Sequence, residues 1–118
     1  MSETAEFPLP ADVTPDEKAT ASREIGRHAT IVDETPARIR FEGRLIGQTG
    51  PNWHLQYTRM YQLPTGFLAA GHDLRDGIVV VHAESVEKLG EGFSNEGVRE
   101  FVEDELRFRG HLKSHASA

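Results

Sequence analysis

Polar and apolar residues alternate almost without interruption from residue 37 to residue 83, and turn residues divide this stretch into four pieces. A period of two places successive side chains on opposite faces of a β-strand. In the first piece Ile39, Phe41 and Leu45 share one face, and the positions between them are mostly charged. The pattern predicts a four-stranded antiparallel meander.

Turn residues set the ends of the four predicted strands. Residues 48–52, 64–66 and 73–77 are rich in Gly, Pro, Asn and Asp, which favour tight turns over strands. The predicted strands are residues 38–45, 53–63, 67–72 and 78–83. The last of them is apolar on both faces, which is typical of a strand in a sheet covered on both sides.

A C-terminal helix is expected to cover one face of this sheet. Residues 95–109 place Val98, Phe101, Val102 and Leu106 at helical spacing, so that they form one apolar stripe. Gly110 then ends the helix. A shorter helical turn is expected over residues 85–89.

The other face has two candidate covers. One is an N-terminal helix over residues 14–28, which begins with a Thr cap at Thr14, Pro15 at the first helical position and Glu17 placed to complete a capping box. The other is a second copy of the chain, because this helix is poor in apolar residues and depends on tertiary packing. The predicted fold class is therefore α+β: a four-stranded antiparallel β-meander with a C-terminal helix, and an N-terminal helix or a second subunit.

Length and charge predict the organisation of the chain. The chain has 118 residues and a net charge of -6; residues 1–34 carry 8 acidic and 3 basic residues, a balance of -5, and the rest carry 11 and 10, a balance of -1. We expect a flexible acidic tail over residues 1–13, a single α+β domain over residues 14–110 and a flexible tail over residues 111–118.

The residue types also bear on the compartment. There is no cysteine, and we find neither a secretory signal nor an apolar run of membrane-spanning length. These observations favour a cytoplasmic protein without a membrane association.

An arginine stripe is the first candidate for a partner surface. Arg38, Arg40 and Arg44 lie on one face of the first predicted strand, and Arg59 on the next strand extends them. Such a stripe can bind an acidic protein segment or nucleic acid, although the acidity of the chain argues against tight nonspecific DNA binding. The alternative is an ordinary solvated face that protects a sheet edge.

An aromatic row is the second candidate. Trp53, Tyr57 and Tyr61 lie four residues apart on one strand and so share a face, together with Arg59. Aromatic side chains of this kind pack in a core or contact a partner, and both alternatives stay open.

The histidines suggest a third candidate, a ligand cavity. His72 and His82 lie beside Ala69, Ala70 and Gly71, whose small side chains leave room between sheet and helix. We predict no metal site, no cofactor and no catalytic residue, because neither the spacing of the six histidines nor the His72-Asp73 pair brings the other required groups with it.

The segment Phe41-Glu42-Gly43-Arg44-Leu45-Ile46-Gly47, followed by an aromatic strand and Thr65-Gly66-Phe67, resembles the β-rich part of small actinobacterial proteins called the EXLDI family. The resemblance covers roughly residues 38–83. It implies a β-rich fold in a bacterial protein and carries over no catalytic residue and no ligand.

The leading hypothesis is a small non-enzymatic binding or regulatory protein that acts through a protein–protein interface, with a homodimer among the expected assemblies. The first alternative is a small-molecule binding protein or an enzyme with a cavity between sheet and helix. The second alternative is a regulator that binds nucleic acid.

Overall fold

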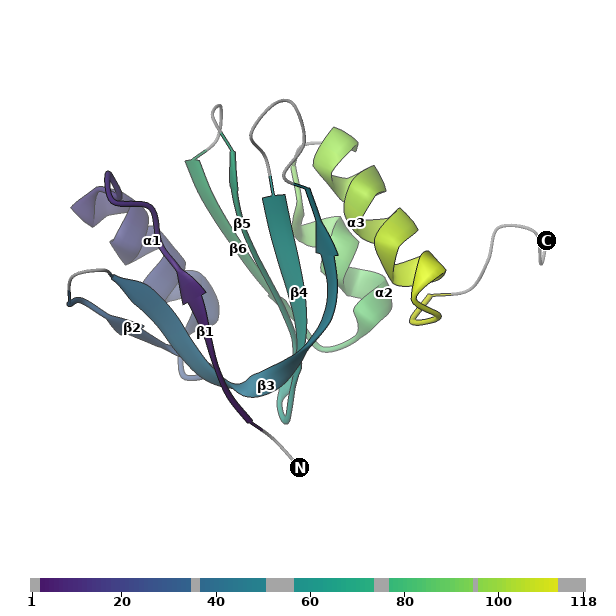
Figure 1. Cartoon of the computed structure of the whole chain (residues 1–118), viewed down its shortest axis with the longest axis horizontal. Helices are drawn as coiled ribbons and strands as arrows, with labels where there is room; N and C mark the ends of the chain where they lie inside the picture. The colour runs from purple at the N-terminus through teal and green to yellow at the C-terminus, as the bar shows by residue number, and fades with distance from the viewer. Residues whose placement is uncertain (1–2, 35–36, 51–56, 74–76, 95, 113–118) are drawn as a thin grey trace.

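The computed structural model describes residues 3–34, 37–50, 57–73, 77–94 and 96–112. Over these residues the chain forms an antiparallel sheet of six strands and three α-helices, so the predicted α+β class is confirmed (Figure 1). The elements in chain order are β1 (Glu3–Pro8), α1 (Pro15–Ile25), β2 (Thr30–Val32), β3 (Arg38–Thr49), β4 (Tyr57–Leu63), β5 (Gly66–Asp73), β6 (Gly77–Ala83), α2 (Val86–Leu89), the 3-10 helix η1 (Gly90–Gly92) and α3 (Glu96–Phe108).

The sheet contains the predicted meander and two further strands. The strand order is β1-β3-β4-β5-β6, and β2 also pairs with β3. The prediction of four strands was too low because β1 and β2 both pair with the first half of β3. Residues 3–8, which we expected in a flexible tail, form β1, since Phe7 pairs with Ile39 and both side chains are fully buried.

Strand β3 is longer than predicted and is irregular at its middle. It runs to Thr49, so Gln48 and Thr49 pair with β4 instead of forming the expected turn. The register shifts between Leu45 and Gly47, which is a β-bulge at Ile46. The bulge buries Ile46 on the opposite face. Leu45 lies on the predicted face, directly opposite Tyr61, but its side chain is 53% exposed.

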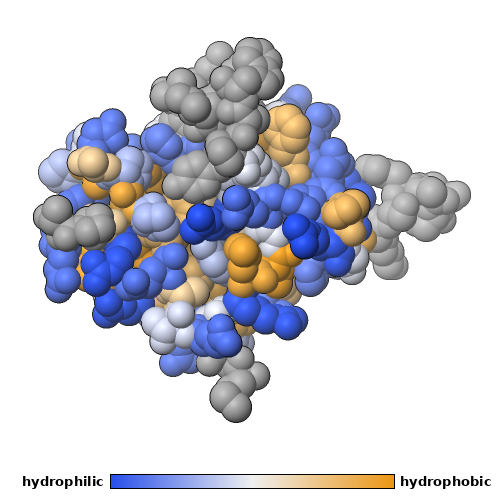
Figure 2. All heavy atoms as spheres, viewed as in Figure 1, coloured by the Kyte–Doolittle hydropathy of each residue, from blue (hydrophilic) through white to orange (hydrophobic). Residues whose placement is uncertain are grey.

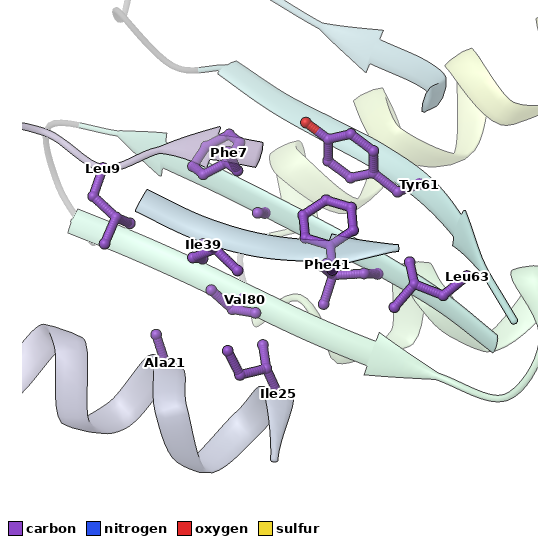
Figure 3. Packing of buried hydrophobic residues seen from close by; sticks show 11 residues of the cluster. Phe7, Leu9, Ala21, Ile25, Ile39, Phe41, Tyr61, Leu63 and Val80 are labelled. Atoms are coloured by element: carbon purple, nitrogen blue, oxygen red, sulfur yellow. The ribbon is translucent and has the colours of Figure 1, made fainter. Parts of the chain in front are cut away.

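The sheet separates two apolar cores, and neighbouring residues of β6 enter different ones. Val80 lies in the core beneath α1 and Val81 in the core beneath α2 and α3. The α1-side core is shown in Figure 3 and consists of Phe7, Leu9, Ala21, Ile25, Ile39, Phe41, Tyr61, Leu63, Leu68, Ala70 and Val80. The α3-side core consists of Ile46, Met60, Ala69, Val81, Leu89, Phe93, Val98, Val102 and Leu106.

The second face of the sheet is therefore covered by α1, the first of the two alternatives. Figure 1 shows α1 on one side of the sheet and α2 and α3 on the other. The capping box is present: the Glu17 N–H donates to Thr14 Oγ1 at 3.1 Å, and the Thr14 N–H donates to Glu17 Oε1 at 3.0 Å. Helix α1 ends at Ile25, three residues before the predicted end, where Gly26 adopts a φ of 51°.

Helix α3 buries a narrower stripe than predicted. Val98, Val102 and Leu106 are buried, but Phe101 is 53% exposed. At about 100° per residue, Phe101 lies about 60° from Val98 on the side away from Val102, which places it at the margin of the contact with the sheet. No helix in the described part of the chain is long and apolar enough to cross a membrane.

Candidate functional site

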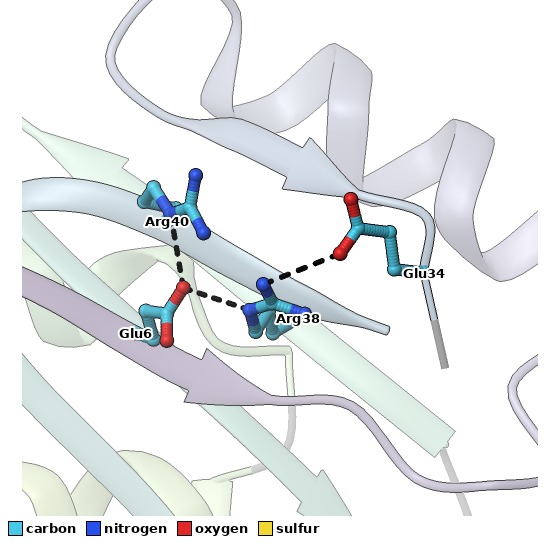
Figure 4. A network of polar contacts seen from close by, with 4 residues as sticks. All are labelled: Glu6, Glu34, Arg38 and Arg40. Atoms are coloured by element: carbon cyan, nitrogen blue, oxygen red, sulfur yellow. Dashed lines mark hydrogen bonds and ion pairs between the residues drawn. The ribbon is translucent and has the colours of Figure 1, made fainter. Parts of the chain in front are cut away.

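The predicted arginine stripe is divided by contacts within the chain. Arg38 Nε and Arg40 Nε both donate to Glu6 Oε2, at 2.8 and 2.9 Å, because β1 places Glu6 directly opposite Arg40. Arg38 also pairs with Glu34 at 3.6 Å (Figure 4). The hydrogen bond from Arg38, and then that from Arg40, hold the pKa of Glu6 below its usual value. The charge of these two arginines is thus largely balanced.

Arg44 differs from its two neighbours on the stripe. It lies opposite Gln62 on β4, and its Nε and Nη2 both donate to Gln62 Oε1, at 3.1 and 2.9 Å. Gln62 is neutral, and no ion pair of Arg44 is found among the described residues. Arg44 therefore keeps its full positive charge on an exposed part of β3.

The edge of β3 beside Arg44 is open. Strand β1 pairs with β3 only as far as Gly43, and β2 only as far as Arg40. From Arg44 to Thr49 the one pairing strand in the described ranges is β4. One edge of this six-residue stretch consequently presents backbone N–H and C=O groups that no described strand uses.

A hollow with a volume of about 410 Å³, open to solvent, is lined by residues of this stretch of β3. Among the described residues, those that line it come from one short stretch of β3, the residue after that strand, and the residue that follows α3. They are Leu45, Ile46, Gly47, Gln48, Gly50 and Arg109. Because nearly consecutive residues of β3 line the hollow, it runs along the main chain of this strand. Side chains from both faces of the strand therefore border it.

Large exposed apolar side chains lie on both β3 and α3. Leu45 is 53% exposed, Phe101 53% and Phe108 83%; these are the large exposed hydrophobic residues in the part that the structure describes. Figure 2 shows separate apolar patches over β3 and α3, with charged side chains between them. We call this region the β3–α3 face and define it by Arg44, Leu45, Phe101, Phe108, Arg109 and the open edge of β3, from which Arg44 and Leu45 project to opposite sides of the sheet.

The aromatic row is only partly described. Tyr61 is buried in the α1-side core, where its ring meets Phe41 edge to face with centroids 4.6 Å apart. Arg59 extends towards the ring of Phe7, with its guanidinium carbon 6.0 Å from the ring centroid. Tyr57 begins β4, and Trp53 lies outside the described residues. Tyr61 and Arg59 thus contribute to the packing of the α1-side core.

His72 and His82 do not come together. Both lie on the α1 face of the sheet, but His72 is opposite Ile78 and His82 is four residues further along β6, about 13 Å away. Ala69 and Ala70, which we expected to leave room for a ligand, are fully buried in the two cores. Over the described residues, no group of three or more His, Cys, Asp or Glu side chains could hold a metal ion.

His82 instead stacks on another histidine. Its ring lies parallel to that of His28, and His28 Nδ1 is 2.9 Å from Thr65 Oγ1. Burial lowers the pKa of His82, and the neighbouring charge of His28 lowers it further. His28 thus joins the segment after α1 to β6 through His82 and to the turn between β4 and β5 through Thr65.

Sequence reasoning missed most of the β3–α3 face. It recognised Arg44, but it placed Leu45 and Phe101 on apolar faces, interpreted Arg109 only as a favourable charge in the last helical turn, and did not consider Phe108. The spacing of Phe101 and Phe108 was an available signal, because residues seven apart lie within about 20° on a helix. The open edge carried no local signal, since it depends on where β1 and β2 stop.

Comparison with known proteins completes the description. No family model matches the chain, and neither the curated proteins nor the solved structures include a match to it. The resemblance to the EXLDI family therefore stays a prediction, and the function has to be inferred from the β3–α3 face itself.

Proposed function

We propose that this chain is a small non-enzymatic binding protein whose β3–α3 face contacts an acidic segment of a partner protein. The observation that carries the proposal is the uncompensated charge of Arg44 at the start of the open edge of β3, the same stretch that carries the exposed Leu45 and lines the hollow. An arginine next to exposed apolar groups is typical of protein interfaces, which are enriched in Arg and aromatic residues.

The contacts within the arginine stripe indicate that one arginine, and not all three, is available to bind a partner. Arg38 and Arg40 already bind Glu6, so a partner carboxylate would have to displace an existing ion pair there. Arg44 binds only a neutral amide oxygen, which an incoming carboxylate can replace at lower cost. We therefore expect Arg44 to contribute more to partner binding than Arg38 or Arg40.

A matched pair of variants tests the proposal. Arg44→Glu and Arg40→Glu make the same change of charge on the same strand. Proteins captured from host lysate by the wild-type chain and by each variant would be compared quantitatively by mass spectrometry. We expect Arg44→Glu to remove specific partners that Arg40→Glu retains, and equal capture by all three chains would contradict the proposal.

The hollow also supports a second candidate, a small-molecule binding protein. Its volume of about 410 Å³ falls in the range of ligand pockets, roughly 300–1,000 Å³. The proposed binding site differs from the one that the sequence suggested. The sequence predicted a cavity between the sheet and a helix, whereas the hollow lies along β3. A saturable rise in Tm with a metabolite, lost in Arg109→Ala, would favour it by linkage.

Binding of nucleic acid remains the third hypothesis. The net charge of -6 disfavours it, and two of the three stripe arginines are paired with carboxylates. Retention on DNA or RNA that weakens steeply with salt would support it.

A further inference from the structure

We infer that the partner segment binds as an extended strand that adds to the open edge of β3 from Arg44 to Thr49. The inference rests on the proposed function and specifies how the partner binds there. The edge is six residues long, or about 20 Å of strand, and no described strand other than β4 pairs with it. Added strands of this kind gain affinity from main-chain hydrogen bonds and specificity from pockets for alternate side chains.

The shape of the hollow fits a strand better than a side chain alone. Leu45 and Ile46 face opposite sides of the sheet, yet both line it, as do Gly47 and Gln48. A cavity reached from both faces of a strand lies beside its backbone. An added strand would occupy this space and place its side chains alternately towards Leu45 and towards the α3 side.

The charges at the edge indicate an acidic partner. Arg44 has no carboxylate partner in the described part, and Arg109 is 56% exposed at its side chain and uses its Nε to bind Glu105 at 3.1 Å. A guanidinium has five N–H donors, so both arginines retain donors for a carboxylate. The inferred partner is therefore an extended segment in which acidic residues alternate with apolar ones.

A second copy of the chain is a poorer occupant. Residues 44–50 contain Arg44 and no acidic residue, and Arg109 lies beside them. Two β3 edges related by a twofold axis would bring two copies of Arg44 together, and residues 44–50 supply no carboxylate to balance them, whereas Arg109 is already paired with Glu105. Like charges in one interface disfavour association.

The test begins with short random peptides displayed on phage and selected on the full chain. The best peptide is then synthesised in two N-methylated forms that block alternate sets of backbone amides. Only one set faces β3 in an added strand, so we expect one form to lose about tenfold or more in affinity and the other to bind nearly as well as the parent. Amide hydrogen exchange of residues 44–49 should slow when the parent peptide binds.

Each outcome bears on one of the two proposals. If both methylated forms bind like the parent while Arg44→Glu abolishes binding, strand addition is wrong and the proposed function stands. If methylation matters but Arg44→Glu has no effect, the acidic partner is wrong. Failure to select any peptide that binds at this edge would overturn strand addition, as would a concentration-dependent dimer that protects residues 44–49.

Discussion

The imidazole rings of His28 and His82 lie face to face, with centroids 3.7 Å apart and planes within 6° of parallel. His82 Nε2 is buried and makes no hydrogen bond in the described part of the chain. The ring also packs against Gly66, where an added Cβ would come within 3.3 Å of it. A positive charge on His82 is therefore costly in the folded chain.

This arrangement predicts a loss of stability in mild acid. The pKa of His82 is lower in the folded chain than its ordinary value of 6.5, first because of burial and then because of His28. The unfolded chain consequently binds more protons below that pH. The contribution of His82 is fully present above about pH 6.5 and decreases as the pH falls towards the folded pKa.

Denaturation in urea between about pH 7.5 and pH 5 measures this effect. We expect His82→Phe to remove part of the pH dependence, because Phe keeps the stacking and cannot be protonated. His111→Gln serves as a control that should follow the wild-type curve. Identical slopes for His82→Phe and the wild-type chain would contradict the prediction.

Glu17 links the start of α1 to the sheet. Its Oε1 accepts from the Thr14 N–H at 3.0 Å, and its Oε2 accepts from the Ile78 N–H at 3.3 Å. We expect Glu17→Ala to lower the free energy of unfolding by about 1–3 kcal/mol, because it leaves two backbone donors without this acceptor. Glu24→Ala, on an exposed position of the same helix, should change it by less than about 0.5 kcal/mol.

Gly77 lies directly beneath this carboxylate. Its φ is 70°, and a Cβ there would collide with Glu17 Oε2. We expect Gly77→Ala to destabilise the chain by more than about 1 kcal/mol, through both backbone strain and this contact. Gly110→Ala is the matched control, because Gly110 has a similar φ of 84° but open space around its Cβ position.

The two glycine variants separate strain from collision. Gly110→Ala reports the backbone strain alone, so Gly77→Ala should cost more in thermal or urea unfolding. In a Glu17→Ala background the difference between them should shrink. A Gly110→Ala cost equal to that of Gly77→Ala would show that the contact with Glu17 is unimportant.

The β-bulge predicts opposite behaviour for two adjacent residues. Ile46 is 7% exposed in the α3-side core, whereas Leu45 is 53% exposed on the β3–α3 face. Ile46→Ala should cost about 2–4 kcal/mol in urea denaturation. Leu45→Ala should cost less than about 1 kcal/mol and weaken binding of the selected peptide instead. If Leu45→Ala cost more stability than Ile46→Ala, the bulge would not lie at Ile46.

The local part of the fold was predictable from sequence. Strands β4, β5 and β6 follow from alternation and turn residues, and α1 follows from Thr14, Pro15 and Glu17. Strand β1 was not predictable, because charge and proline dominate residues 3–8 and the strand exists only by pairing with β3 more than thirty residues away. Glu6 lies on β1 and pairs with Arg38 and Arg40 but not with Arg44. Because β1 was not predictable, this difference among the three arginines was not predictable either.

One strand serves both cores, and this has a consequence for unfolding. Strand β3 contributes Ile39 and Phe41 to the α1-side core and, beyond the bulge, Ile46 to the α3-side core. Neither core can lose its part of β3 without loosening the same continuous backbone. We therefore expect both sides of the sheet to melt in a single cooperative transition, and a partner held at the edge of β3 to slow the opening of the distant α1 side as well.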